Sequence, residues 1–395
     1  PTTDMSKDEV PMSDFVFETT PRVICEFDGA LQLGTLCKEF GAKRAVLLSD
    51  PGLQKVGLID APYAALKEAG IETLLWTDVQ ADPPEESILA AVKGARDFKA
   101  DIVIGLGGGS SLDTAKLVAL LCGKDQKLDE IYGIGLATGP RLPLIQVPTT
   151  AGTGSEVTPI SIVTTPTHEK KGVVSSLLYP DVALLDAKLT MGLPAPITGM
   201  TGIDAMVHAI EAYTTKHKKN ALSDGLAIRA MQLMTAHIDD AVSASPSREA
   251  REAMLQGSML AGMAFANAPV AAVHALAYPL GGHFHVPHGH SNALVLIEVL
   301  KFNRDAAVSQ YAELARAILP DEKFANDDAA CDRFIAFMTD MVERMPFSRT
   351  LREVGVAESD LDMLATDAMK VERLLINNPR EMTFEAARAI YAAVL

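Results

Sequence analysis

Residues 102–116 read IVIGLGGGSSLDTAK. The apolar run Ile102–Leu106 predicts a buried strand, because strands of a parallel sheet are covered by helices on both faces. Three glycines follow it directly and predict a tight turn, and Leu112–Cys122 then predicts a helix. A strand, a glycine-rich turn and a helix in this order favour an α/β fold in which the helix begins at a bound anion.

The same alternation extends on both sides of this stretch. Up to about residue 190, short apolar runs alternate with segments of helical spacing, and the connections between them are short. This pattern predicts a parallel, doubly wound sheet. Strands are expected at 45–49, 71–76, 102–106 and 143–147, with edge strands within 15–27, and helices at 29–40, 61–69, 85–98 and 112–122.

The pattern changes after about residue 190, where long amphipathic helices dominate. The segment Met191–Pro196 contains two prolines and a glycine, which interrupt any helix. We therefore expect an α/β domain over residues 1–191 and an all-helical domain over residues 192–395. The clearest helical segments of the second domain are 221–238, 248–265 and 328–342.

Composition limits the classes of partner. The chain has 51 acidic and 35 basic residues, so its formal net charge of −16 makes it a poor candidate for binding nucleic acid or an anionic membrane. The polar start of the chain and the lack of a long apolar run predict no signal peptide and no membrane span, hence a cytoplasmic protein. Reduced thiols are expected, because no C-x-x-C pair occurs among Cys25, Cys37, Cys122 and Cys331.

The glycine-rich turn is the first candidate binding site. Gly107, Gly108 and Gly109 let backbone N–H groups approach an anion closely, and the helix that follows, which carries Asp113 and Lys116, points its positive end at the same place. This arrangement suits a pyrophosphate. The turn is not the usual G-x-G-x-x-G, and the alternative is a turn that serves packing alone.

Two further strand ends carry polar residues. Asp50 follows the strand at 45–49, where a carboxylate would accept hydrogen bonds from a ribose diol and repel a 2′-phosphate, which favours NAD over NADP. The alternative is an aspartate that caps a helix or a turn. Thr149 and Thr150 follow the strand at 143–147 in a loop of small and hydroxyl residues, which suits contact with the same cofactor.

The second half of the chain contains a candidate metal site. Five of the nine histidines lie in residues 273–292, which read VHALAYPLGGHFHVPHGHSN. Residues 202–211 read GIDAMVHAIE, and on a helix Asp204 and His208 of this segment lie one turn apart on one face. A single histidine is more often a hydrogen-bonded core or surface group than a ligand, so the expectation rests on the combination. One carboxylate with three imidazoles suits Fe(II) or Zn(II), and the candidate ligands are Asp204, His208, His274 and His288.

Four stretches together resemble the iron-containing alcohol dehydrogenase family, also called group III alcohol dehydrogenases. They are GGGSSLDTAK at 107–116, VPTTAGTGSEVTP at 147–159, TGIDAMVHAIEAY at 201–213 and VHALAYPLGGHFHVPHGHSNALVL at 273–296. The resemblance covers the chain from about residue 15 to its end. It implies a dinucleotide-binding α/β domain, an all-helical domain and a catalytic cleft between them, and we expect a homodimer or larger homo-oligomer.

The resemblance also implies roles for individual residues. It implies that the four candidate ligands hold the metal and that NAD is the cofactor. The cofactor contacts that it implies are Asp50, Gly108, Gly109, Ser110, Thr149, Thr150, Lys170 and Leu189. We also expect a contact from Gly107, the first glycine of the turn.

One departure from the family pattern concerns proton transfer. Many members carry HALAH, with a second histidine near the nicotinamide, whereas this chain has HALAY and therefore Tyr278. The pKa of a free tyrosine is about 10, well above that of histidine, so the implied proton relay does not carry over directly. Tyr278 and His283 are the candidate catalytic residues, and His285 is another candidate for the relay. The alternative, which we expect, is that these side chains form a polar wall of the cleft.

The expected reaction is reversible hydride transfer between NAD(H) and a small alcohol or aldehyde, with the metal as a Lewis acid toward the substrate oxygen. Alternatives with the same fold are a hydroxyacid–oxoacid transhydrogenase, a polyol dehydrogenase, a lyase of dehydroquinate synthesis and a maleylacetate reductase, which lacks an intact metal set. An alternative of another class is a non-catalytic nucleotide-binding module that has lost its ligands. All four candidate ligands are present, so we expect an NAD-dependent, iron-type alcohol dehydrogenase.

Overall fold

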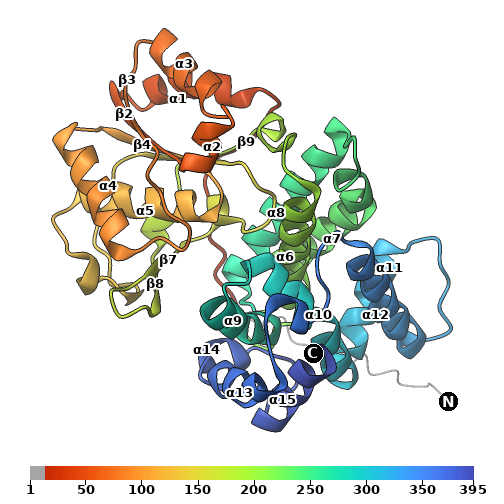
Figure 1. The fold of residues 1–395 in the computed structure, drawn as a ribbon. Coiled ribbons are helices and arrows are strands. Elements are labelled where there is room, and N and C mark those ends of the chain that lie inside the picture. The colour runs from red at the N-terminus through yellow and green to blue at the C-terminus, as the bar shows by residue number, and fades with distance from the viewer. Residues whose placement is uncertain (1–13) are drawn as a thin grey trace.

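A six-stranded parallel sheet organises the N-terminal half of the chain (Figure 1). The computed structural model describes residues 14–395, and every neighbouring pair in this sheet is parallel. The predicted parallel sheet is therefore confirmed. Its strands, in spatial order, are β1 (Val23–Cys25), β9 (Val182–Leu185), β6 (Leu144–Pro148), β4 (Ile102–Gly107), β2 (Arg44–Leu48) and β3 (Glu72–Trp76).

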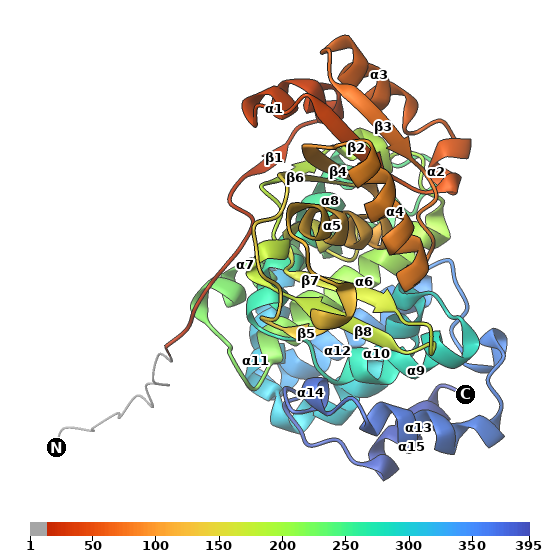
Figure 2. The same ribbon diagram turned by 90° about the vertical axis from the view of Figure 1, so that its left-hand side faces the viewer.

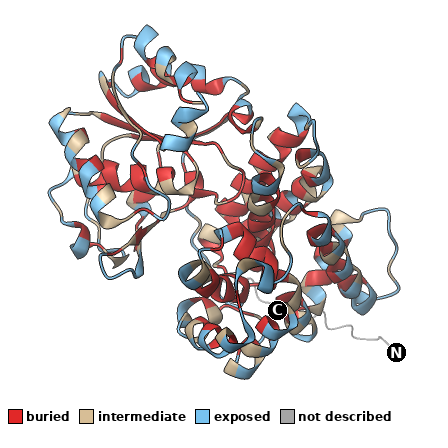
Figure 3. Ribbon diagram, viewed as in Figure 1, coloured by how far each residue is buried: buried red, intermediate tan, exposed pale blue. Residues whose placement is uncertain are grey.

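Helices cover both faces of the sheet, and Figure 3 shows the strands largely buried between them. Side chains alternate along a strand, so Val46 and Leu48 of β2 join one apolar core while Ala45 and Leu47 join the other. This covering explains why the strands read as continuous apolar runs. The helices of this half are α1 (Leu33–Glu39), α2 (Pro51–Lys55), α3 (Asp60–Glu68), α4 (Glu85–Asp97) and α5 (Gly109–Gly123).

Some elements differ from the expected ones. The helix expected at 112–122 begins at Gly109, because Gly108 takes the N-cap position and the last glycine of the turn is already helical. Only Val23–Cys25 forms a strand within the segment 15–27, and the polar residues 1–13 lie outside the described part of the chain. The sequence pattern does not predict the small second sheet, which contains β5 (Gly133–Ile134), β8 (Lys170–Val174) and β7 (Ile160–Thr164).

The second half is helical, as predicted, and both views place α13 and α15 at the opposite end of the molecule from β3 and α3 (Figures 1 and 2). Within residues 14–395 no single helix has the length and apolar composition to cross a membrane. The two helices Arg248–Asn267 and Ala272–Phe284, which are bent by 105° relative to each other, meet these two criteria only when they are taken together. The division between residues 191 and 192 stays a prediction. The helices are α6 (Ala195–Thr214), α7 (Ala221–Ala241), α8 (Arg248–Asn267), α9 (Ala272–Phe284), α10 (His288–Asn303), α11 (Val308–Ile318), α12 (Asp327–Arg344), α13 (Leu361–Met369), α14 (Glu372–Leu375) and α15 (Phe384–Ala393).

Candidate functional site

Neighbouring strands of the parallel sheet end at one edge, where most of the expected cofactor residues lie. The strands β9, β6, β4 and β2 are neighbours in that order. Asp50 follows β2, the glycine turn follows β4, Thr149 and Thr150 follow β6, and Leu189 follows β9. Because parallel strands present their carboxyl ends at the same edge, the fold brings these residues together.

The glycine turn has the backbone geometry of an anion site. Gly107 has a φ of 156°, and a Cβ there would lie 2.7 Å from the Ser111 hydroxyl oxygen, so no side chain fits. A Cβ at Gly109 would lie 2.9 Å from Cγ2 of Thr153. Gly108 is the N-cap of α5 and has no side chain to bond the first N–H groups of the helix. The first backbone N–H groups of α5 therefore have no side-chain cap, and a phosphate at the turn would accept hydrogen bonds from them.

Two of the expected cofactor residues make other contacts. Lys170 begins β8, away from the strand ends, and its ammonium group lies 2.8 Å from the Asp82 carboxylate. The backbone N–H of Asp82 donates to the Ser110 hydroxyl oxygen at 3.2 Å, so Lys170 is linked to the glycine turn through Asp82. Asp50 is the N-cap of α2, where one carboxylate oxygen accepts a hydrogen bond from the Leu53 N–H at 3.0 Å. The helix-capping role of Asp50 is thus present, and it uses only one of the two oxygens.

A buried ionic network, which the sequence pattern does not reveal, fastens the loop after β6 to α5. Lys116 is fully buried, and its ammonium group donates to the Ser155 hydroxyl at 2.9 Å, the Thr158 hydroxyl at 3.1 Å and the Ile160 carbonyl at 2.8 Å. Burial lowers the pKa of Lys116 to about 8. Burial likewise raises the pKa of Glu156 to about 7, although Lys116 acts to lower it. The network holds the threonine loop against the helix that begins at the glycine turn.

The raised pKa of Glu156 predicts a pH dependence of stability. Its ordinary pKa is 4.5, so between pH 4.5 and about 7 the folded state binds more protons than the unfolded state. The stability contributed by this group is complete below pH 4.5 and is lost as the pH rises to about 7. We expect Glu156→Gln to remove this part of the fall in the free energy of unfolding, measured by urea unfolding across the range. The exposed control Glu169→Gln should retain the fall, and parallel curves for wild type and Glu156→Gln would contradict the assignment.

The four expected metal ligands converge although they come from three helices. Their ligand atoms all lie within 4.8 Å of one another. Asp204 Oδ1 lies 3.5 Å from Nε2 of His208, 3.7 Å from Nε2 of His274 and 3.3 Å from Nε2 of His288. The first three residues are buried, whereas the His288 side chain is 45 % exposed. The cluster is therefore open on the side of His288.

Local sequence explains how the second pair of ligands reaches the first. His285 is the C-cap of α9 and has the left-handed conformation, with a φ of 53°, and Pro287 is already the N-cap of α10. The chain thus reverses over a few residues and places His288 in the first turn of α10. A Cβ at Gly289 would lie 2.3 Å from the Met200 carbonyl oxygen. Only glycine lets the start of α10 approach α6 this closely.

Glu211 supports the cluster through one of its ligands, although the sequence pattern does not indicate this role. Its buried carboxylate accepts hydrogen bonds from the Ala271 N–H at 3.0 Å, the Val273 N–H at 2.7 Å and Nδ1 of His274 at 2.6 Å. One side chain therefore caps the start of α9 and orients the ring of the ligand on that helix. Its place one turn beyond His208 on the same face of α6 is a signal that could have revealed it.

The charges in the cluster favour a cation. Burial acts to raise the pKa of Asp204, but His208 and His288 outweigh it and hold that pKa well below its ordinary value. Burial lowers the pKa of His208 to about 3, so this imidazole is neutral. Burial also acts to lower the pKa of His274, but Glu211 and Asp204 raise it to about 9. An ionised carboxylate and neutral imidazoles are the forms that bind metals, so binding would displace the proton of His274.

The side-chain amide of Asn292 lies against the cluster, and its contacts indicate whether the cluster suits a metal ion. Its Nδ2 donates to Asp204 Oδ1 at 2.7 Å and lies 3.4 Å and 3.3 Å from Nε2 of His274 and His288. Its Oδ1 is buried without a hydrogen-bond partner among the described residues. The Asn292 amide nitrogen thus lies near ligand atoms of three of the four candidate residues, and turning the amide over would present the orphaned oxygen to them instead. One carboxylate and three imidazoles in this arrangement fit a borderline divalent cation.

Aromatic rings flank the cluster. The Tyr278 ring centroid lies 6.5 Å from that of His274, on the same helix, and 6.2 Å from that of His288. The Phe265 ring stacks on His208 with centroids 4.3 Å apart. These rings place aromatic surface beside three of the four candidate ligands.

The structure does not bring His283 to the cluster. Its side chain is exposed and is hydrogen-bonded to the carboxylate of Asp367 on α13. His285 is likewise no neighbour of the ligands by any contact among the described residues, and its backbone ends α9. Of the candidate catalytic residues, only Tyr278 therefore lies beside the four ligands.

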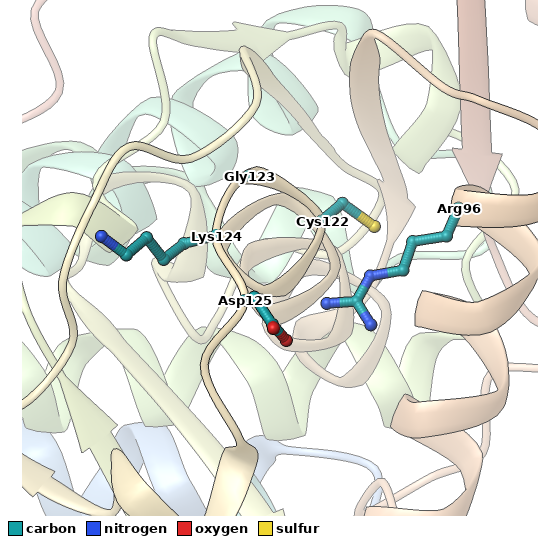
Figure 4. Close-up of a pocket in the computed structure, with 5 residues that line it drawn as sticks. All are labelled: Arg96, Cys122, Gly123, Lys124 and Asp125. Atoms are coloured by element: carbon teal, nitrogen blue, oxygen red, sulfur yellow. The ribbon is translucent and has the colours of Figure 1, made fainter.

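A surface pocket is separate from both candidate sites (Figure 4). Helix α5 begins at the glycine turn and has 15 residues, so its two ends are about 22 Å apart. The pocket lies at the far end of this helix, and its lining residues are Arg96, Cys122, Gly123, Lys124 and Asp125.

Two family models match the two halves of the chain. Residues 20–187 match the model described as iron-containing alcohol dehydrogenase. Residues 198–395 match the model described as Fe-containing alcohol dehydrogenase family, C-terminal. Together they span both the parallel sheet and the helical half that carries the four ligands.

Individual relatives agree with the family models. The chain is 41 % identical over 372 residues to long-chain-alcohol dehydrogenase 1 of Geobacillus thermodenitrificans. The aligned region covers 92 % of this chain and 93 % of that protein. It is 36 % identical over 383 residues to sulfoacetaldehyde reductase of Bilophila wadsworthia, and this aligned region covers 96 % of this chain and 98 % of that protein. The crystal structure of a 1,3-propanediol oxidoreductase matches with a TM-score of 0.93 at 33 % identity, over 97 % of this chain and 100 % of the other. Since sequence, fold and the convergence of the four side chains agree, the chain belongs to the iron-containing alcohol dehydrogenase family.

Proposed function

We propose that this protein is a metal-dependent oxidoreductase that transfers a hydride between NAD(H) and a small alcohol or aldehyde. The observation that carries the proposal is the convergence of a carboxylate and three imidazoles in a cluster that is open on one side, as a catalytic metal site requires. The names of the relatives, which act on alcohols or aldehydes, support it. We propose Fe(II) as the metal, with Zn(II) as the alternative.

In this proposal the α/β half binds NAD at the carboxyl ends of its strands. Backbone N–H groups of the glycine turn and the start of α5 would hold the pyrophosphate. The carboxylate oxygen of Asp50 that does not cap α2 would accept a hydrogen bond from the ribose diol. The proposed contacts are Asp50, Gly107, Gly108, Gly109, Ser110, Thr149, Thr150, Lys170 and Leu189.

The helical half would hold the metal and shape the reaction space. When bound, the divalent ion supplies Lewis acidity toward the substrate oxygen and the nicotinamide accepts or donates the hydride. Glu211 fixes the ring of His274, and the ring of Phe265 stacks on that of His208. The proposed metal ligands are Asp204, His208, His274 and His288.

Tyr278 would form the polar wall beside the nicotinamide. Burial raises the pKa of Tyr278, although Arg373 acts to lower it, so the hydroxyl keeps its proton at neutral pH. We propose that it packs against the nicotinamide and is not the main proton donor. His283 stays a prediction as a catalytic residue, since its exposed ring is paired with Asp367 outside the cluster.

Metal analysis combined with a cofactor-linked assay tests the function. The protein is purified without chelators, its iron and zinc are measured, and the same sample is assayed with NAD and alcohols and with NADH and aldehydes. We expect stoichiometric metal and a turnover that chelation removes and Fe(II) restores. Cofactor binding without turnover would favour the nucleotide-binding module. Turnover only when an alcohol and a second carbonyl compound are both present would favour the transhydrogenase.

Asp50→Asn is expected to narrow the preference for NAD over NADP. Asparagine keeps the helix cap, because its side-chain oxygen still accepts from the Leu53 N–H, but it removes the charge that would repel a 2′-phosphate. We expect the ratio of kcat/KM for the two cofactors to fall by about 10- to 100-fold, the loss typical of one charged contact. Asp60→Asn, on the exposed start of α3, is the matched control. A wild-type preference for NADP would show that the assignment of Asp50 is wrong.

Assembly and domain division stay predictions. Light scattering of the purified protein checks for the proposed homodimer or larger homo-oligomer. Limited proteolysis followed by mass spectrometry checks the proposed boundary, where a first cut is expected within residues 191–196.

A further inference from the structure

A cation lies beside Tyr278, the aromatic residue next to the metal cluster. The Arg373 guanidinium is close enough to the Tyr278 hydroxyl oxygen to donate a hydrogen bond to it. The Tyr278 ring centroid lies 6.2 Å from that of His288, the most exposed of the four ligands. Tyr278 is therefore a neighbour both of Arg373 and of the most exposed ligand.

Neighbouring contacts hold the backbone that carries Arg373. Arg373 lies on α14, and this short helix packs against α9, which carries His274 and Tyr278. Just after α14, the Asn377 side-chain amide donates to the Val270 carbonyl oxygen at 3.1 Å, ahead of the start of α9. The exposed side chain of Arg373 thus projects from a segment that is fastened to the wall of the site.

Among the described residues, no carboxylate pairs with this guanidinium. Other arginines of the helical half are paired, for example Arg333 with Glu322 and Arg388 with Asp362. Within residues 14–395, Arg373 forms no ion pair, and its described side-chain neighbour is the uncharged Tyr278 hydroxyl. A divalent ion held by one carboxylate and three imidazoles would place a net positive charge nearby. Two like charges repel at short range, so together they favour an anion near them.

We propose that Arg373 is a specificity-determining residue and that the substrate is a short-chain aldehyde or alcohol with an anionic group at the end remote from the reacting oxygen. This inference rests on the proposed function, because it takes the reacting oxygen to lie at the metal cluster. A guanidinium presents a planar fork of N–H donors that matches carboxylate, sulfonate and phosphate oxygens. Tyr278 neighbours both Arg373 and the rings of His274 and His288, so we expect it to limit the length of a substrate that reaches from the cluster to Arg373.

Succinate semialdehyde and its methyl ester test the inference, because the main difference between them is the charge. NADH oxidation is measured with each for wild type, Arg373→Gln and Arg373→Lys. For wild type we expect kcat/KM to be about 10- to 100-fold higher with the acid than with the ester. In Arg373→Gln this advantage should vanish through a higher KM, while ester turnover, metal content and NADH affinity stay unchanged. Arg373→Lys should restore part of the advantage, since it keeps the charge but not the fork.

Controls separate this inference from the proposed function. Arg388→Gln removes an exposed arginine that is paired with Asp362, and it should leave the acid preference intact. Oxidation of isethionate and of glycerol phosphate then distinguishes a sulfonate or a phosphate from a carboxylate. An equal loss with acid and ester in Arg373→Gln, an altered NADH affinity, or a wild-type preference for the ester would overturn the inference while turnover persists. Absence of turnover with every alcohol and aldehyde would instead overturn the proposed function, and this inference with it.

Discussion

His288→Ala is expected to lose most of its bound divalent ion and nearly all of its turnover while remaining folded. The variant removes one of three imidazoles that converge on Asp204, and the exposed position of His288 means that no buried cavity is left behind. Loss of the metal removes several kcal/mol of stabilisation of the developing charge, so turnover should fall by roughly 10³-fold or more. Elemental analysis and a steady-state assay of the same dialysed sample measure both effects.

Further variants distinguish specific loss of the metal from loss of the fold. Asp204→Ala and His274→Ala should also lose the ion, but both residues are buried, so unfolding must be monitored by circular dichroism alongside. His237→Ala is the matched control, because that ring bonds to the Leu233 carbonyl on α7, outside the cluster. Full metal occupancy in both His288→Ala and His274→Ala would falsify the metal assignment.

Glu211→Gln is expected to weaken metal binding by about 10- to 100-fold, the usual effect of removing a partner that orients a ligating histidine. The carboxylate accepts three hydrogen bonds, from the N–H groups of Ala271 and Val273 and from the His274 ring. A glutamine must turn an NH₂ group toward at least one of these donors, so the start of α9 and the ligand ring lose a fixed position. Competition with a chelating dye measures the Kd for Zn(II).

Excess metal distinguishes positioning from chemistry in this variant. If Glu211 only orients His274, turnover of Glu211→Gln should recover in part when Fe(II) is added in excess. Glu298→Gln on α10, whose carboxylate pairs with Lys301 at 2.8 Å, should bind metal as wild type does. Unchanged metal affinity together with a lower Tm would mean that Glu211 serves only the stability of α9.

The parallel sheet could be predicted because its strands are buried on both faces. Val46, Leu48 and their neighbours on β2 are apolar without interruption, and turn residues bound the run. The second sheet escaped prediction for the opposite reason. Its strand β8 begins with Lys170 and Lys171, both exposed, so no apolar run marks it. Burial of the strand, rather than its length, made the difference.

The candidate ligands could be named from the sequence, but several of their supports could not. Spacing on one helix relates Asp204 to His208, because residues one turn apart share a face whatever the rest of the chain does. The hydrogen bond from His274 to Glu211 joins residues 63 positions apart, and that from Asn292 to Asp204 joins residues 88 apart. Local periodicity carries no information about such pairs.

The sequence by itself determined the fold class, the glycine turn and the residue types available for a metal, since these follow from local patterns of apolar, glycine and ligating residues. Only the tertiary structure decided which side chains face each other. The close approach of Gly289 to Met200 sets where the first turn of α10 meets α6, and the packing of α14 on α9 sets Arg373 beside Tyr278. Such contacts depend on how helices pack, and packing is decided by the shape of whole surfaces rather than by neighbours in the chain.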